Sequence, residues 1–164
     1  MTKATGTYIV KMDSRGRIFV IEPVGLYLGH VAGKESGVYC RLGPSLKKNT
    51  RALFLLRLDE ADKIIEVNQD PTFRQFDDVE NLDTETQSGR VNTFFRPVQI
   101  KSNRIQFNLR ERARLNLPKD DSRIILQGTG LGFVIWAADE FSAIYPEVYE
   151  YYGFGEAEDD ESEE

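Results

Sequence analysis

A strand–turn–strand pattern occurs twice in this chain, and no other feature of the sequence constrains the fold as strongly. The first copy reads YIVKMD, SRGR and IFV over residues 8–20, and the second reads FFRPVQI, KSNR and IQF over residues 94–107. Arg17 of the first copy falls on Arg104 of the second. A connector follows each copy, and each half closes with two strands around a glycine-containing turn. Because the pieces keep the same order, they predict an internal repeat.

The turns of the two copies differ in composition, but they can share one backbone conformation. Gly16 falls on Asn103. Asparagine is the residue that best replaces glycine where the backbone enters the left-handed region, so both residues are expected to form the turns. Asp13 falls on Ile100, and the second copy therefore lacks the acid of the first.

Short apolar runs bounded by turn residues predict a mostly β protein with minor α structure. Two helices are expected. One covers NLRERARLNL, with Asn108 as its N-cap and Pro118 beyond its end, and the other covers ADEFSAIYPEVYEYYGF, which Pro146 breaks or kinks. The connector at residues 21–30 contains proline and two glycines, so a short helix or none is expected there. The expected strands are YIVKM, RIFVIE, GVYCRL, RALFLLRL, KIIEV, NTFFRPVQI, RIQF, RIILQ and FVIWA.

Charge is distributed unevenly, and together with composition it predicts four segments. The net charge is +7 over residues 1–58, −8 over 59–89, +2 over 90–154 and −7 over the last ten residues. The basic front permits an anionic partner although the whole chain carries −6. The expected segments are a first repeat at 1–67, an acidic loop or linker at 68–89, a second repeat with a C-terminal helix at 90–154, and a disordered acidic tail at 155–164.

The first turn carries more charge than a turn requires. Asp13 can accept hydrogen bonds from backbone N–H groups of its own turn, and Gly16 can supply a positive φ. Arg15 and Arg17 would then project from a short, stiff element, and arginine forks suit phosphate oxygens and the acceptor edge of guanine. On turn chemistry alone the simpler interpretation is favoured, in which Arg17 pairs with Asp13 on a surface hairpin.

Metal sites and catalytic centres have little support in the sequence. A single His30 and a single Cys40 cannot form a Cys/His zinc site, and acids such as Asp59 and Asp77 lack the Gly and Glu spacing of a calcium loop. No paired acid and base and no nucleophile pattern occurs. We therefore expect that the protein is not an enzyme, that it has no cofactor and that it has no small-molecule substrate. No apolar run approaches the length of a membrane span, so no membrane partner is expected.

Two further motifs have simpler structural explanations. The stretch GTGLG at 128–132 is followed by another strand rather than a helix, so it is expected to be a hairpin turn and not a phosphate-binding loop. Aromatic residues near the C-terminus could stack on bases, but packing of the last helix is the favoured interpretation. These residues are Tyr145, Tyr149, Tyr151 and Tyr152.

Three stretches together resemble the MraZ proteins, tandem-repeat relatives of the AbrB/SpoVT transition-state regulators. GTYIVKMDSRGRI (6–18) is similar to the family's opening, a Gly-x-Tyr followed by Asp-x-x-Gly-Arg. FFRPVQIKSNRIQF (94–107) is similar to the second copy of that motif, although it reads Ile-Lys-Ser-Asn-Arg. RIILQGTGLGFVIWAADEF (123–141) resembles the family's strand, glycine turn and Ile-Trp strand before a last helix.

The resemblance implies two AbrB-like units of the swapped-hairpin or double-psi type in one subunit, with subunits that close into rings. It implies a cytoplasmic, nucleoid-associated bacterial regulator that binds duplex DNA upstream of a division and cell-wall gene cluster. The family's DNA-facing positions correspond to Asp13, Arg15 and Arg17 in the first copy and to Arg104 in the second, with Lys101 as a basic neighbour.

We therefore expect a non-enzymatic regulator of the MraZ type that binds duplex DNA and associates with itself. The alternative is an oligomeric scaffold or interaction protein of the same fold whose DNA binding is weakened or lost. The altered second motif and the acidic net charge favour that alternative.

The acidic tail provides a first testable prediction. Its composition cannot bury apolar surface, so it should act as a mobile anion that competes with phosphate for basic groups. Deletion of residues 155–164 should tighten non-specific binding to duplex DNA, most strongly at low salt, in a fluorescence anisotropy titration. An affinity that the deletion leaves unchanged across the salt range would contradict this role.

Overall fold

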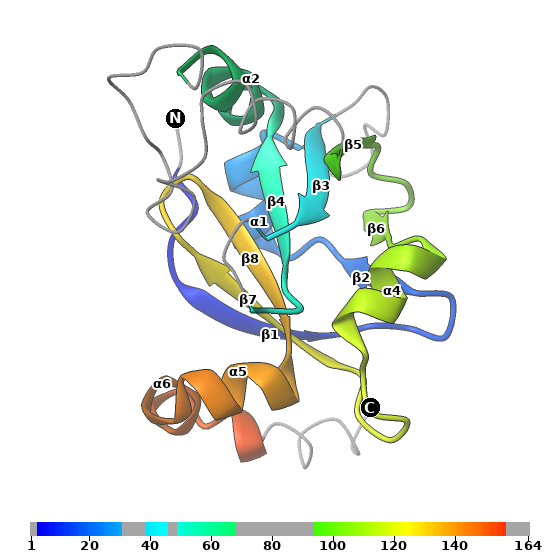
Figure 1. Cartoon of the computed structure of the whole chain (residues 1–164), viewed down its shortest axis with the longest axis vertical. Helices are drawn as coiled ribbons and strands as arrows, with labels where there is room; N and C mark the ends of the chain where they lie inside the picture. Colours follow the sequence, from blue (N-terminus) through cyan, green and yellow to red (C-terminus); the bar gives the residue numbers. More distant parts are fainter. Residues whose placement is uncertain (1–2, 31–38, 46–48, 68–93, 157–164) are drawn as a thin grey trace.

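Both halves of the chain contribute strands to one antiparallel sheet. The structure, a computed structural model, describes residues 3–30, 39–45, 49–67 and 94–156 (Figure 1). The elements of the first half are β1 (Thr7–Lys11), β2 (Arg17–Phe19), α1 (Glu22–Leu28), β3 (Cys40–Pro44), β4 (Leu53–Arg57) and α2 (Leu58–Val67). Those of the second are β5 (Arg96–Val98), β6 (Arg104–Gln106), α4 (Leu109–Leu115), β7 (Arg123–Gly128), β8 (Gly132–Ala137), α5 (Ala138–Ile144), α6 (Pro146–Tyr151) and the 3₁₀ helix η2 (Phe154–Glu156).

The strand order in the large sheet is symmetric between the two halves of the chain. If each strand is replaced by its equivalent in the other half, the same order is read from the opposite edge. The order is β1-β7-β8-β4-β3-β5, and β2 and β6 form a separate two-stranded ribbon. β1 of the first half pairs with β7 of the second, and β5 of the second pairs with β3 of the first. Each half therefore supplies an edge strand to the other half, around a central β4–β8 pair. The expectation of a mostly β protein is confirmed.

A pseudo-two-fold relation is visible in detail at the ribbon. Ile18 lies opposite Ile105 at its centre. The Val20 N–H donates to the carbonyl of Asn103 at 2.9 Å, and the Phe107 N–H donates to the carbonyl of Gly16 at 2.8 Å. These are equivalent hydrogen bonds in the register in which Arg17 falls on Arg104. The expected left-handed turn residues are confirmed, because φ is 77° at Gly16 and 57° at Asn103.

The correspondence continues into the helices that follow the ribbon strands. α1 and α4 begin and end at equivalent positions, and each ends at a left-handed residue, Gly29 with φ 72° and Asn116 with φ 50°. The predicted N-cap of α4 is confirmed as a capping box, since Asn108 Oδ1 accepts from the Glu111 N–H at 2.8 Å and the Glu111 carboxylate accepts from the Asn108 N–H at 2.9 Å.

Two apolar clusters lie on opposite faces of the large sheet. One cluster joins the inner side of the β2–β6 ribbon and α1 to one face, and the other joins α5, α6 and η2 to the opposite face. Alternation along β7 shows this division, because Ile124 and Leu126 belong to the first cluster and Ile125 to the second. Trp136 lies in the second cluster and is buried. The ribbon is therefore held against the sheet through one face only.

Helix content exceeds the expectation of two helices. KIIEV is not a strand but part of α2, where Asp59 and Glu60 occupy the first turn, a favourable place for negative charge, and Ala61 is fully buried. The connector at residues 21–30 holds α1. The proline lies in the first turn of α1, where a backbone N–H would have no partner within the helix, and Gly29 is the C-cap. The proline and the glycine that favoured a short helix or none therefore begin and end this short helix.

Other element predictions agree with the structure or are shortened by it. GTGLG joins the antiparallel strands β7 and β8, as expected for a hairpin turn. Pro146 separates α5 from α6, as expected. Among the described residues of NTFFRPVQI the strand is β5, and the strand expected over RIFVIE is limited to β2. No helix among the described residues is long and apolar enough to cross a membrane.

Some segment predictions fall on residues that the structure does not describe. The expected linker at 68–89 lies outside the described residues, as does most of the expected tail at 155–164. Gly155 and Glu156, which begin that tail, belong to η2. The repeat boundaries at residues 67 and 90 stay predictions.

The isoleucine pair at the centre of the ribbon should be essential for stability. Ile18 is 2% and Ile105 0% exposed. Ile105→Ala should lower the free energy of unfolding by about 2–5 kcal/mol in a urea titration, because it deletes buried carbons and leaves a cavity. The double variant with Ile18→Ala should cost less than the sum of the single losses, because the two side chains are neighbours in one core. Additive losses would contradict direct packing between them.

Candidate nucleic-acid interface

The face of the ribbon that points away from the sheet carries polar and charged residues. Because side chains alternate along a strand, burial of Ile18 and Ile105 places the residues on either side of them on the outer face. The cross-strand pairs there are Arg17 with Gln106 and Phe19 with Arg104. Arg17 and Arg104, two of the arginines selected from the sequence, therefore lie on one short surface, although they come from different halves of the chain.

Asp13 organises the first turn as the sequence predicts. Its Oδ1 accepts from the backbone N–H groups of Arg15 and Arg17, both at 2.9 Å, and its Oδ2 accepts from Arg17 Nε at 2.9 Å. The Gly16 N–H donates to the Asp13 carbonyl at 3.0 Å. The contact in the simpler interpretation, Arg17 with Asp13, is confirmed, but the surface hairpin is not, because β1 pairs with β7 and β2 pairs with β6. That same contact holds the Arg17 guanidinium in a defined orientation beside the turn.

These contacts lower the pKa of the Asp13 carboxyl. Burial by itself would raise the pKa of Asp13, but the hydrogen bonds from Arg17 and Arg15 and the charge of Arg17 outweigh it, and that pKa lies below its ordinary value of 3.8. Asp13 is therefore ionised at neutral pH, and its charge offsets part of the charge of Arg17.

The second turn is one residue shorter than the first. Lys101 and Arg104 close it through paired backbone hydrogen bonds of 3.1 and 2.9 Å, whereas Asp13 and Arg17 close the first turn. Lys101 therefore lies at the position in the second turn that is equivalent to Asp13 in the first. Ile100, which falls on Asp13 when the two sequences are aligned without a gap, is fully buried. Both central residues of this turn have positive φ. Where the first turn has a carboxylate, the second turn has a cation.

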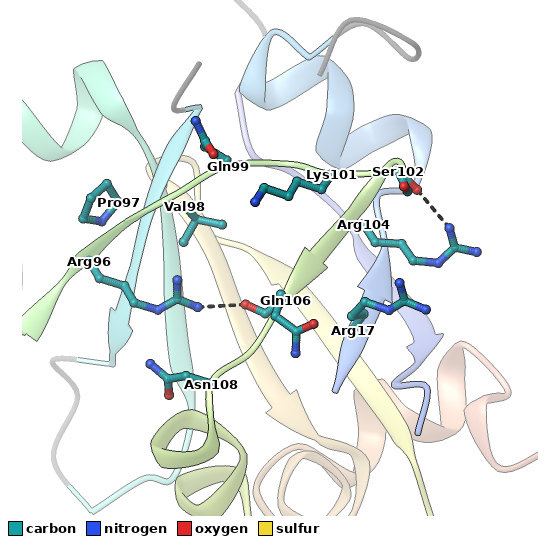
Figure 2. A pocket seen from close by; sticks show the side chains of 10 residues that line it. All are labelled: Arg17, Arg96, Pro97, Val98, Gln99, Lys101, Ser102, Arg104, Gln106 and Asn108. Carbon is teal, nitrogen blue, oxygen red and sulfur yellow. Dashed lines mark hydrogen bonds between the residues drawn. The ribbon is translucent and has the colours of Figure 1, made fainter. Parts of the chain in front are cut away.

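Arg104 is held by its own turn and by the opposite strand. Its Nη1 donates to the carbonyl of Ser102 at 2.9 Å, a contact that Figure 2 shows as a dashed line. Its guanidinium carbon lies 5.8 Å from the ring centroid of Phe19, a cation–π distance. The Phe19 side chain remains 49% exposed.

A groove of about 640 Å³ runs from the ribbon to β5. Figure 2 shows the side chains that line it, which include four cations and no carboxylate: Arg17, Arg96, Pro97, Val98, Gln99, Lys101, Ser102, Arg104, Gln106 and Asn108. Arg96 is neutralised, because both oxygens of Glu111 accept from it at 2.7 and 2.8 Å. Lys101 and Arg104 therefore account for most of the positive character of the groove, because Asp13 offsets part of the charge of Arg17. Arg15 is exposed at the tip of the first turn and does not line it.

Three residues that the sequence did not identify as part of the site contact the two turns. Gln106 donates to the carbonyl of Arg15 at 2.7 Å. A ring nitrogen of His30 lies 2.9 Å from Asn103 Oδ1. The Arg112 side chain lies over Gly16, where the Cδ atom would be 2.6 Å from an added Cβ. Only the paired ribbon brings these residues to the turns, and no local sequence pattern indicates them.

Comparison with protein families and with curated proteins gives no match for this chain. No protein-family model matches the chain. No curated protein matches it either.

Among the residues that the structure describes, no group of three or more His, Cys, Asp or Glu side chains is placed to hold a metal ion. Cys40 is fully buried, and this burial raises the pKa of its thiol to about 12, so it is protonated at neutral pH.

The tyrosines near the C-terminus mostly pack. Tyr145 lies 5.9 Å from Trp136 and 5.2 Å from Phe141 between ring centroids, and Tyr149 packs against the same cluster. The packing interpretation is confirmed for these two residues. Tyr151 is 83% exposed and lies at the end of α6, on the other side of the sheet from the ribbon.

The ionised form of Asp13 should stabilise the first turn in a pH-dependent way. The folded-state pKa lies below the unfolded value of about 3.9, so the contribution to stability is complete above that value and is lost as pH falls through the folded pKa. In an NMR titration the amide shifts of Arg15 and Arg17 should change with a midpoint below 3.8. Asp13→Asn keeps the Oδ1 acceptor and should abolish the titration. A midpoint at or above 3.8 would contradict the hydrogen-bonded carboxylate.

Proposed function

We propose that the protein is a non-enzymatic regulator that binds duplex DNA through the outer face of the β2–β6 ribbon and its two turns. The observation that carries the proposal is the convergence of Arg17, Lys101 and Arg104 on one groove that no carboxylate lines. Phosphate contacts dominate the affinity of proteins for DNA, and a cationic groove supplies them.

The shape of the element also supports DNA as the ligand. A two-stranded antiparallel ribbon is one of the few elements that the major groove admits, and arginine forks match the O6 and N7 atoms of guanine. Asp13 orders the first turn before binding, so less conformational entropy is lost when its arginines engage the ligand. Arg15 and Arg17 are the candidates for base contacts, whereas Lys101 and Arg104 are candidates for phosphate contacts.

The finer identity follows the resemblance to the MraZ proteins. The exchange of β1 and β5 between the halves supports AbrB-like units of the swapped type, with the double-psi topology as part of the proposal. Action on a division and cell-wall gene cluster, a ring of subunits, and a cytoplasmic, nucleoid-associated location belong to the same proposal. No metal or cofactor is required by it.

The second candidate is a scaffold of the same fold. It is favoured by an apolar surface beside the ribbon, where Phe19 is 49% and Leu26 58% exposed along a groove of about 310 Å³. The Asp13 carboxylate also offsets charge at the first turn. A protein partner would use such a surface more readily than DNA would.

A salt-dependent titration of the full chain with duplex DNA separates the two candidates. The regulator should bind at low salt, and log K should fall with log [salt] at a slope of about −0.9 per neutralised phosphate. No binding at low salt would sink the DNA proposal and leave the scaffold.

Single substitutions should rank the cations. Arg17→Ala should cost more than Arg104→Ala, and about 1–3 kcal/mol if Arg17 contacts guanine, because Asp13 holds it in place for a base contact. Arg104→Ala should mainly make the salt slope less steep, by about one phosphate. Lys119→Ala, on an exposed loop away from the groove, serves as the matched control. Asp13→Ala should weaken binding although it removes a negative charge, because the turn loses its acceptor.

Two outcomes would contradict this ranking. One is tighter binding by Asp13→Ala, which would mean that the charge of Asp13 matters more than the order it imposes. The other is an equal loss for Arg17→Ala, Arg104→Ala and Lys119→Ala while circular dichroism shows an intact fold. That result would mean that the two arginines contribute to DNA binding only through the general charge of the surface.

A further inference from the structure

Each turn of the ribbon is held by side chains from the opposite half of the chain. Gln106, from β6, reaches the first turn, where its Nε2 lies 2.7 Å from the Arg15 carbonyl and 3.4 Å from that of Gly16. His30, which follows α1, reaches the second turn at Asn103, 2.9 Å away. The turns are therefore not independent loops, because neither is complete without the other half.

The contacts of Gln106 determine how its side chain must be oriented. Its Nε2 also lies 2.9 Å from the Phe107 carbonyl, so every partner of this nitrogen is a backbone oxygen. A side-chain amide offers two N–H donors, and only its nitrogen can satisfy such partners. The amide thus links the tip of the first turn to the strand on which Gln106 stands. Its own position lies directly opposite Arg17 in the ribbon.

The equivalent position in the first half carries a different residue. Phe19 stands there, and its ring packs against the Arg104 guanidinium. An amide therefore supports the backbone of the first turn, whereas an aromatic ring supports a side chain of the second. The internal repeat keeps the fold but assigns different support to its two arginine-bearing turns.

We propose that Gln106 is a positioning residue, through which the second half of the chain sets the presentation of Arg15 and Arg17 to DNA. This inference rests on the proposed function. Gln106 acts on the carbonyl of Arg15 and so on the backbone that precedes Gly16 and Arg17. The side-chain hydrogen bonds of Gln106 go to the carbonyls of Arg15, Gly16 and Phe107, whereas Arg104 and Lys101 belong to the other turn, so we expect Gln106 to affect one arginine-bearing turn and not the other.

The first measurement needs no DNA. Gln106→Leu keeps the size of the side chain but removes both donors. Amide hydrogen exchange at Gly16 and Arg17, followed by NMR, should become about two- to tenfold faster, the range expected for one lost hydrogen bond. Ala143→Leu adds a leucine to the exposed surface of α5, on the opposite face of the sheet, and should leave these rates unchanged. Unchanged rates in Gln106→Leu would overturn the inference.

The second measurement is a double-mutant comparison of DNA affinity. Gln106→Leu should weaken binding about two- to tenfold in the otherwise native chain and in Arg104→Ala. In the double variant Arg15→Ala/Arg17→Ala the same substitution should have less than a twofold effect, because the groups it positions are absent. If Gln106→Leu lowers DNA affinity equally in the native chain and in the Arg15→Ala/Arg17→Ala variant, Gln106 contacts DNA directly or the substitution destabilises the fold in general. Either result would overturn the positioning role.

The two measurements keep this inference separate from the proposed function. If the native chain fails to bind duplex DNA, the proposed function fails, while faster exchange at Gly16 and Arg17 still supports Gln106 as the support of the turn. If the chain binds DNA and the exchange rates do not change, the function stands and the positioning role is wrong.

Discussion

Antiparallel pairing of β2 with β6 determines where everything else in this protein can lie. The pair is centred on Ile18 and Ile105, both buried against the large sheet. In a strand a register shift of one residue moves every side chain to the other face. The same pairing that buries the isoleucines therefore turns Arg17 and Arg104 outward. The core and the candidate interface lie on the two faces of one ribbon, whose two strands have three residues each.

Exchange of strands extends this dependence to the whole fold. β1 pairs with β7 and β5 pairs with β3, so neither half can complete its part of the sheet alone. The central β4–β8 pair joins the halves a third time. Several contacts that define the site thus connect residues far apart in the chain, and the loop-closure entropy of such a topology must be overcome before these contacts form. Two sequence repeats form one structural unit.

Local chemistry made several parts of the structure predictable. The Asp13 turn, the left-handed Gly16 and Asn103, and the N-cap at Asn108 all follow from interactions within a few residues. The same kind of reasoning failed for α2, part of which was expected to be a strand. For the connector it allowed a short helix or none, and the structure has a short helix that a proline begins and a glycine ends. Position relative to the helix ends, rather than residue type, decided their effect.

The sequence alone determined the repeat, the mostly β class and the residues of each turn, because strand alternation, turn chemistry and capping act over short distances. Tertiary structure decided how the turns are combined. It shortened the second turn so that Lys101, not Ile100, took the place of the acid, and it brought Gln106 to Arg15 across the ribbon. It also neutralised Arg96 through Glu111 while leaving Lys101 and Arg104 in a groove without carboxylates. Such outcomes depend on which strands pair and in which register, and burial across the whole chain selects that register.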